Sequence, residues 1–266
     1  MSVNLYNTSY AEHSARVYRE VRAETYDLDL GQTGWMSGEE FRTFFEWLAL
    51  TPASRVLEVG CGAGGCALYL ARTVGATVTG IDVNENGIRN ARSLAQTEGL
   101  TSQVSFELAD AGQKLLFADN SFDAVFSNDA MCHIPRRLQV LEEWYRVLKP
   151  GGRMLFTDAL IVTGVLSNEE IATRSSIGTY FFLPPGENER LIEEAGFHLL
   201  SGVNVTGAVA AISGRWLHAR EQKSQELLAF EGETNYFGLQ RFLATVHALA
   251  QEERLSRYLY VASKQA

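Results

Sequence analysis

Four glycines within six residues form the most distinctive pattern of the sequence. They lie in residues 60–65 and directly follow the apolar run 56–59, in which Glu58 is the one charged residue. Glycine leaves the backbone amides of a tight turn open to a ligand, because it has no side chain and adopts turn conformations at little cost. Asp82 ends the next β-branched run. Its carboxylate can accept hydrogen bonds from both hydroxyls of an adenosine ribose, so the pattern predicts a site for a nucleoside cofactor.

The glycine turn by itself is compatible with more than one cofactor. Gly60, Gly62 and Gly65 also fit the spacing of the dinucleotide fingerprint, and Asp82 lies near the position where that fingerprint has its acidic residue. A nicotinamide-dependent oxidoreductase is therefore an alternative. Two further alternatives are a turn that only packs a strand against a helix, and a relative that binds the cofactor without catalysis.

The residues around the turn alternate between strand and helix patterns. Strands are predicted at 55–59, 77–82, 104–108, 122–128 and 152–157, with helices near 64–74, 84–98 and 136–148 between them. Such alternation produces βαβ units and a parallel sheet covered on both faces, with ligands beyond the carboxyl ends of the strands. After a loop-rich stretch at 160–186, we expect a helix at 188–195, a strand at 197–205, helices at 214–230 and 238–251, and a strand at 258–263. Two helices precede the sheet, at about 7–22 and after a capping box at Ser37.

Five motifs in the same order resemble those of the class I methyltransferases that use S-adenosylmethionine. They are Glu58-x-Gly60-x-Gly62-x-Gly64, the ribose motif 80–82, the adenine motif 108–111, and the segments 122–128 and 148–155. A dehydrogenase has no need of the later motifs. The resemblance implies an α/β, Rossmann-like fold with a seven-stranded, mostly parallel sheet. It also implies an N-terminal helical cover at 1–50 and a methyltransferase domain at 51–266, with a substrate lid at about 160–190 and helices at about 214–251.

The same resemblance assigns a set of residues to S-adenosylmethionine and its product S-adenosylhomocysteine. Asp82 would bind the ribose and Asp110 the adenine amino group, while the carbonyls of Asn128 would meet the methionine ammonium. The segment 34–38 is similar to a turn that covers the cofactor in the phosphoethanolamine branch of the family. The full predicted set is Trp35, Ser37, Gly60, Cys61, Gly62, Asp82, Val83, Asp110, Ala111 and Asn128.

Two residues are candidates for the catalytic step. Methyl transfer needs mainly alignment of acceptor, methyl group and sulfur, and it needs a base only where the acceptor carries a proton. His133 follows the fourth strand, and a histidine pKa of about 6.5 suits proton removal near neutral pH. The segment 129–134 is similar to phosphoethanolamine, sarcosine/dimethylglycine and sterol methyltransferases, and in the first of these the histidine pairs with a tyrosine that corresponds to Tyr10. A structural role is the alternative for both residues.

Aromatic residues of the C-terminal third are candidates for the acceptor pocket. Tyr180, Phe182, Trp216 and Tyr236 could line a pocket for an apolar molecule or bind an amine through cation–π contacts, and ordinary core packing is the alternative. Gly178 stands where the phosphoethanolamine enzymes carry a phosphate-binding arginine, which argues against a phosphorylated acceptor. The expected acceptor is a small amine, or a carbon or oxygen of a natural product.

Composition narrows the choice of partners. The 266 residues carry 23 Lys and Arg against 32 Asp and Glu, and a net charge of −9 disfavours nucleic acid. We expect a cytoplasmic enzyme, because the sequence has no secretion signal and no apolar segment long enough to span a bilayer. The three cysteines lack the spacing of metal ligands, so no metal is predicted. The oligomeric state is left open between a monomer and a homodimer.

Overall fold

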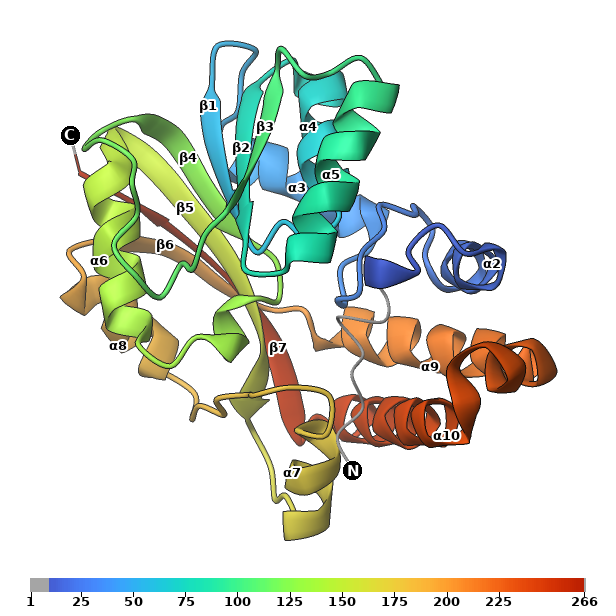
Figure 1. Ribbon diagram of the computed structural model, residues 1–266. Helices are drawn as coiled ribbons and strands as arrows, with labels where there is room; N and C mark the ends of the chain where they lie inside the picture. The colour runs from blue at the N-terminus through green and yellow to red at the C-terminus, as the bar shows by residue number, and fades with distance from the viewer. Residues whose placement is uncertain (1–9, 266) are drawn as a thin grey trace.

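The strands form a single seven-stranded sheet. The computed structural model describes residues 10–265, and the strands lie in the order β3-β2-β1-β4-β5-β7-β6 (Figure 1). They are β1 (Arg55–Val59), β2 (Thr77–Asp82), β3 (Val104–Leu108), β4 (Phe122–Ser127), β5 (Leu148–Val162), β6 (His198–Asn204) and β7 (Leu255–Ser263). Neighbouring strands from β3 to β5 pair in parallel, whereas β7 is antiparallel to both β5 and β6. The prediction of a Rossmann-like, mostly parallel sheet is confirmed.

Helices cover both faces of the sheet, because side chains alternate between the faces along each strand. The covering helices are α3 (Gly38–Trp47), α4 (Gly65–Val74), α5 (Glu85–Thr97), α6 (Arg137–Val147) and α8 (Glu187–Glu194). Val56 and Phe126 face the apolar layer of α3, α4 and α5. Leu57 and Val125 face the layer of α6 and α8 on the other side of the sheet (Figure 1). Burial on both faces explains the continuous apolar runs of the central strands.

The remaining helices form a third apolar cluster. They are α2 (Arg16–Thr25), α9 (Thr206–Gln222) and α10 (Ser224–Gln251), and the short helix α7 (Asn168–Arg174) contacts α10 (Figure 1). Trp35 and Trp216 both belong to this cluster, with their ring centroids 6.0 Å apart. The cluster therefore joins the N-terminal cover to the C-terminal helices.

Several elements differ from the sequence prediction, among them α10, which begins at Ser224 rather than near residue 238. β5 continues to Val162, because its extension pairs with β7 and gains ladder hydrogen bonds. α7 occupies part of the segment that was expected to be a loop, and it begins with a capping box of Ser167 and Glu170. α9 begins at Thr206 rather than near residue 214. A helix as short as α7 gives too few residues for a periodic apolar pattern, so the capping box was its main signal in the sequence.

The strand order reverses between β1 and β4, which lie side by side in the middle of the sheet. Ligands bind at such a reversal in open α/β sheets, because the connections leave the two strands in opposite directions and open a crevice. The short 3-10 helix η1 (Met131–His133) follows β4 at this point. Within residues 10–265, no helix combines the length and the apolar character needed to cross a membrane.

Candidate functional site

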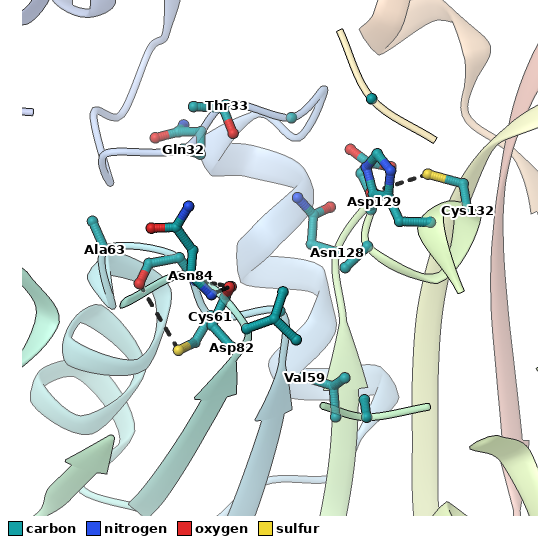
Figure 2. Close-up of a pocket in the computed structure, with 18 of the residues that line it drawn as sticks. Gln32, Thr33, Val59, Cys61, Ala63, Asp82, Asn84, Asn128, Asp129 and Cys132 are labelled. Atoms are coloured by element: carbon teal, nitrogen blue, oxygen red, sulfur yellow. Dashed lines mark hydrogen bonds between the residues drawn. The ribbon is translucent and has the colours of Figure 1, made fainter. Parts of the chain in front are cut away.

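A cavity of about 350 Å³ lies beyond the ends of β1, β2 and β4. Its size falls in the usual range of small-molecule pockets, roughly 300–1,000 Å³. Figure 2 shows Cys61 and Asp82 on the side of β1 and β2, and Asn128 and Asp129 on the side of β4. The lining brings together these predicted residues: Tyr10, Trp35, Gly60, Cys61, Gly62, Asp82, Val83, Asp110, Ala111, Asn128, His133 and Tyr180.

The glycine turn has a backbone that a side chain would disrupt. Gly60 and Gly62 have φ angles of +76° and +53°, in the left-handed region that favours glycine. A Cβ at Gly60 would collide with the side chain of Ala130, and a Cβ at Gly62 would collide with the hydroxyl of Tyr10. The amide of Gly60 donates to the carbonyl oxygen of Ile81 at 2.8 Å, which ties the turn to β2. The turn is therefore held against β2, and its glycines leave the backbone without side chains over it.

Two acidic side chains in the lining keep capacity for further hydrogen bonds. The carboxylate of Asp82 accepts from the amides of Gly62 and Asn84, each at 2.8 Å and each on a different oxygen. Burial raises the pKa of Asp82, and these amides oppose the rise. Asp110 accepts from the amide of Gly112 at 2.8 Å. Because a carboxylate oxygen has two lone pairs, each of these acids can still accept hydrogen bonds from a ligand.

Glu58 is buried below the glycine turn and lines the cavity. Burial raises its pKa well above the usual value, and the charge of Asp82 adds to the rise, while a hydrogen bond from the amide of Ala67 lowers it. Its Oε2 has no hydrogen-bond partner among the described residues. Burial favours the protonated form of this carboxyl, which is hydrogen-bonded to an amide in the first turn of α4.

His133 is held in one orientation by its surroundings. Its Nδ1 lies 2.8 Å from the carbonyl oxygen of Thr179, which can only accept, so Nδ1 carries the proton and Nε2 is the basic nitrogen. The imidazole also contacts the ring of Tyr180, with centroids 4.4 Å apart. Burial lowers the pKa of His133 below its usual 6.5. The imidazole is therefore neutral at pH 7 and can act as a base.

Tyr10 lies over the glycine turn. Its hydroxyl faces Gly62 and hydrogen-bonds the side chain of Thr33. Burial raises the pKa of Tyr10, and the charge of Asp82 raises it further. Tyr10 and His133 thus line the same cavity, with the tyrosine hydroxyl against the glycine turn. The pairing of the two residues stays a prediction.

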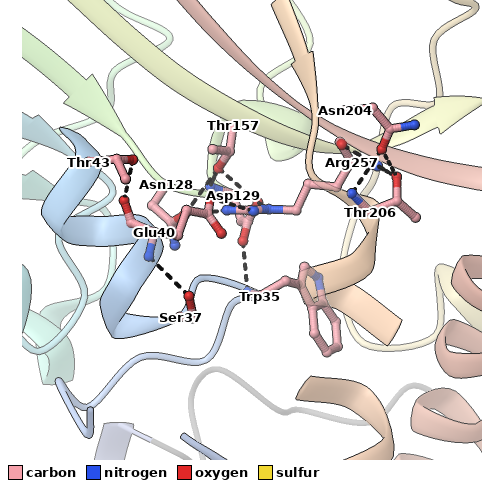
Figure 3. Close-up of polar contacts among 10 residues, drawn as sticks. All are labelled: Trp35, Ser37, Glu40, Thr43, Asn128, Asp129, Thr157, Asn204, Thr206 and Arg257. Atoms are coloured by element: carbon pink, nitrogen blue, oxygen red, sulfur yellow. Dashed lines mark hydrogen bonds and ion pairs between the residues drawn. The ribbon is translucent and has the colours of Figure 1, made fainter. Parts of the chain in front are cut away.

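A buried arginine organises the β4 side of the cavity. Arg257 of β7 donates to Asp129 at 2.7 Å, to Glu40 at 2.6 Å and to the side-chain oxygen of Asn128 at 2.8 Å (Figure 3). The hydroxyl of Thr157 lies 3.1 Å from that oxygen and 2.9 Å from the carboxylate of Asp129, and its one hydrogen can be donated to only one of them. The side-chain oxygen of Asn128 is thus already bound by Arg257, which holds this residue at the end of β4.

Asp129 connects this cluster to the N-terminal cover. It has a φ of +53°, which is uncommon for a residue other than glycine. Its carboxylate accepts from the backbone amide of Trp35 at 2.8 Å. This contact fixes the 34–38 turn against β4, as the predicted covering role of Trp35 requires.

Four predicted site residues are not part of the described cavity lining. The hydroxyl of Ser37 caps α3 by accepting from the amide of Glu40 at 3.1 Å. Trp216 and Tyr236 lie in the core between α9, α10 and the cover. Phe182 packs against a small apolar cluster of β5, β7 and α10. The three aromatic rings do not line the cavity because their apolar faces pack against the helices and strands around them.

The sequence prediction missed several residues of the cavity lining. Ala159, Arg174, Ile177 and Phe242 line the cavity. The capping box at Ser167 was a signal for the helix that carries Arg174. No local pattern tells which way a single arginine at the end of such a helix points, so this part of the lining needed the structure.

Comparisons with known proteins agree with this geometry. Residues 57–156 match the family Methyltransf_11, described as a methyltransferase domain. These residues therefore form a segment similar to a methyltransferase domain. The matched span includes the glycine turn, Asp82, Asp110, Asn128 and His133. The sequence-based prediction of a class I methyltransferase is thereby confirmed, and the oxidoreductase alternative receives no support.

Three curated methyltransferases show how far the likeness extends. "Methyltransferase GfsG" from Streptomyces halstedii is 40% identical over 61% of this chain and 59% of its own length. A glycine/sarcosine/dimethylglycine N-methyltransferase from Actinopolyspora halophila is 32% identical over 69% of this chain and 32% of its own length. Phosphoethanolamine N-methyltransferase from Triticum aestivum is 32% identical over 79% of this chain and 41% of its own length. The matched part of this chain thus spans about three fifths or less of each relative.

Solved structures share the fold of this chain. The phosphoethanolamine N-methyltransferase 2 of Haemonchus contortus, in complex with phosphomonomethylethanolamine and S-adenosylhomocysteine, has a TM-score of 0.83 at 24% identity, covering 98% of this chain and 60% of that one. The [4+2]-cyclase SpnF has a TM-score of 0.75 at 20% identity, and the match covers 98% of this chain and 95% of SpnF. The fold is therefore compatible with more than one chemistry, and the reaction has to be argued from the site.

Proposed function

We propose that this protein transfers the methyl group of S-adenosylmethionine to a small-molecule acceptor. The observation that carries the proposal is a single cavity whose lining includes the bare glycine turn and Asp82 together with His133 and Tyr180. A nucleoside on the turn and an acceptor beside the histidine would share one space. The net charge of −9 supports a small molecule rather than a nucleic acid.

The residues of the turn fit S-adenosylmethionine. When bound, this cofactor supplies a methyl group on a positively charged sulfur. The carboxylate of Asp82 accepts from the ribose hydroxyls with the lone pairs that Gly62 and Asn84 leave over. Asp110 accepts from the adenine amino group, with Val83 and Ala111 beside the ring in the lining. The other cofactor residues predicted from the sequence, Trp35, Gly60, Cys61 and Asn128, complete the enclosure from the cover and the strand ends.

His133 acts on the acceptor. The hydrogen bond from Nδ1 to the Thr179 carbonyl fixes the ring plane and keeps the proton on Nδ1, so Nε2 is the nitrogen that would accept a proton. For an acceptor that carries a proton on the reacting atom, His133 would accept that proton as the atom takes the methyl group, and the electron pair of the broken carbon–sulfur bond would stay on sulfur. Packing against Tyr180 holds the imidazole in place. Most of the rate enhancement comes from alignment, which supplies about 7–11 kcal/mol in favourable cases.

An acceptor screen tests this function. Purified protein is incubated with S-adenosylmethionine and a panel of amines, phenols, β-dicarbonyl compounds and carboxylic acids, and S-adenosylhomocysteine formation is followed by mass spectrometry. We expect methylated product from at least one class, and a loss of turnover with Asp82→Ala. Fluorescence titration with reduced nicotinamide cofactor is the control, and saturable binding of that cofactor in place of S-adenosylhomocysteine would contradict the proposal.

A further inference from the structure

Arg174 is a buried cation in the cavity wall. It is the last residue of α7, only 2% exposed, and it lines the cavity. Its guanidinium carbon lies 4.4 Å from the ring centroid of Tyr180 and 5.1 Å from that of Phe242. Among the described residues, its Nη1 has no hydrogen-bond partner. Two aromatic rings hold the guanidinium in position, and neither ring neutralises its charge.

The other buried arginines show how unusual this arrangement is. Arg137 pairs with Asp158, Arg220 pairs with Glu231, and Arg257 pairs with both Glu40 and Asp129. Each of these three therefore has a carboxylate that compensates for its burial. Within residues 10–265, Arg174 has no ion pair of this kind. A buried charge is expensive to keep without a counter-charge, which points to a ligand that supplies one.

The neighbours of Arg174 place this charge on the acceptor side. Tyr180 contacts both Arg174 and His133, with each group 4.4 Å from the tyrosine ring centroid. After burial, the charge of Arg174 is one of the causes that lower the pKa of His133. Ile177 and Phe242 add apolar surface to the same lining. Arg174 thus offers a positive charge beside apolar side chains.

We infer that Arg174 binds a carboxylate of the methyl acceptor, and that the rest of the acceptor is largely apolar. This inference rests on the proposed function. A guanidinium suits a carboxylate because its planar donors match the two carboxylate oxygens. A phosphate dianion would leave one negative charge without a partner in this wall. The methyl group goes to another atom of the acceptor, near Nε2 of His133, while the carboxylate fixes the orientation of the molecule.

A matched pair of probes tests the inference. Cinnamate and cinnamamide have nearly the same shape and differ in charge. Their affinities are measured by ligand-observed NMR on protein loaded with S-adenosylhomocysteine. We expect the wild type to bind cinnamate about tenfold or more tightly than cinnamamide, as a charge-assisted hydrogen bond implies. Arg174→Met should abolish this preference, Arg174→Lys should keep part of it, and the exposed Arg89→Met should match the wild type.

The outcomes separate this inference from the proposed function. Calorimetry should give the same S-adenosylhomocysteine affinity for the wild type and Arg174→Met. A loss of that affinity in a folded Arg174→Met protein would assign the arginine to the cofactor and overturn the inference. Equal binding of the two probes by the wild type, or tighter binding of phenyl phosphate than of cinnamate, would also overturn it. If the wild type itself does not bind S-adenosylhomocysteine, the proposed function fails, whereas the probe preference can still be measured on the unloaded protein.

Discussion

Replacing Arg257 tests how the N-terminal cover is held to the sheet. The side chain is fully buried and lies 2.7 Å from Asp129 and 2.6 Å from Glu40. Arg257→Met keeps an unbranched side chain but leaves two buried carboxylates without their cation. Opposite charges about 4 Å apart attract by about 4 kcal/mol at an effective dielectric constant of about 20, and desolvation offsets part of this. Breaking a buried pair destabilises proteins by about 3–5 kcal/mol, which is the loss of unfolding free energy that we expect.

Urea unfolding at pH 7 measures this loss. The exposed Arg89→Met serves as the control for removal of an arginine and should lie within about 0.5 kcal/mol of the wild type. Adding Glu40→Gln and Asp129→Asn to Arg257→Met should restore much of the stability, because no unpaired charge is then left; asparagine also tolerates the positive φ of residue 129. A loss below about 1 kcal/mol for Arg257→Met would mean that the two carboxylates are solvated or protonated at little cost and do not need Arg257.

Two other perturbations follow from the buried titratable groups. Burial raises the pKa of Glu58 well above 4.5. At a pH between the unfolded-state pKa and the folded-state pKa, the folded protein therefore keeps a proton that the unfolded chain loses. Over that range the free energy of unfolding falls as pH rises, by about 1.4 kcal/mol per pH unit. Glu58→Gln should remove this contribution in urea unfolding at about pH 5 and pH 7; an unchanged pH slope would mean that the carboxyl is ionised in the fold. Burial lowers the pKa of His133, so the rate with a proton-bearing acceptor should fall only on the acid side of pH 6.5. His133→Gln should lower kcat by about 10²- to 10⁴-fold with unchanged affinity for S-adenosylhomocysteine, and wild-type kcat in this variant would assign the histidine a structural role.

The sheet and the cofactor side of the site could be predicted because their signals are local. The β-branched run before Gly60 and the run that ends at Asp82 each specify a strand and its end, and parallel pairing then brings both ends to one edge. The same logic placed Asp110, Asn128 and His133 at that edge. Only the order of strands along the chain was needed for this step.

The acceptor side depends on contacts that the sequence does not display. Glu40 and Arg257 are 217 positions apart, and no local pattern reports their pairing. Trp216 and Tyr236 are residue types that often line ligand pockets, yet both rings pack in the apolar core between α9 and α10. Arg174 is the converse case, since an ordinary helix-ending arginine is turned into the cavity. The direction of a side chain in a packed helical layer is decided by its neighbours, which are distant in the sequence.

Calorimetric titration with S-adenosylhomocysteine shows whether this cavity holds the methyl donor. We expect saturable binding to the wild type and binding weakened about tenfold or more in Asp82→Asn, because the asparagine lacks the charge and presents a donor in place of one acceptor oxygen. Asp82→Asn keeps the size of the side chain, and its thermal unfolding checks that the turn at Gly62 still folds. No binding at about millimolar S-adenosylhomocysteine, which corresponds to about −4 kcal/mol, or equal affinity in the two proteins, would contradict the assignment of this cavity to the methyl donor.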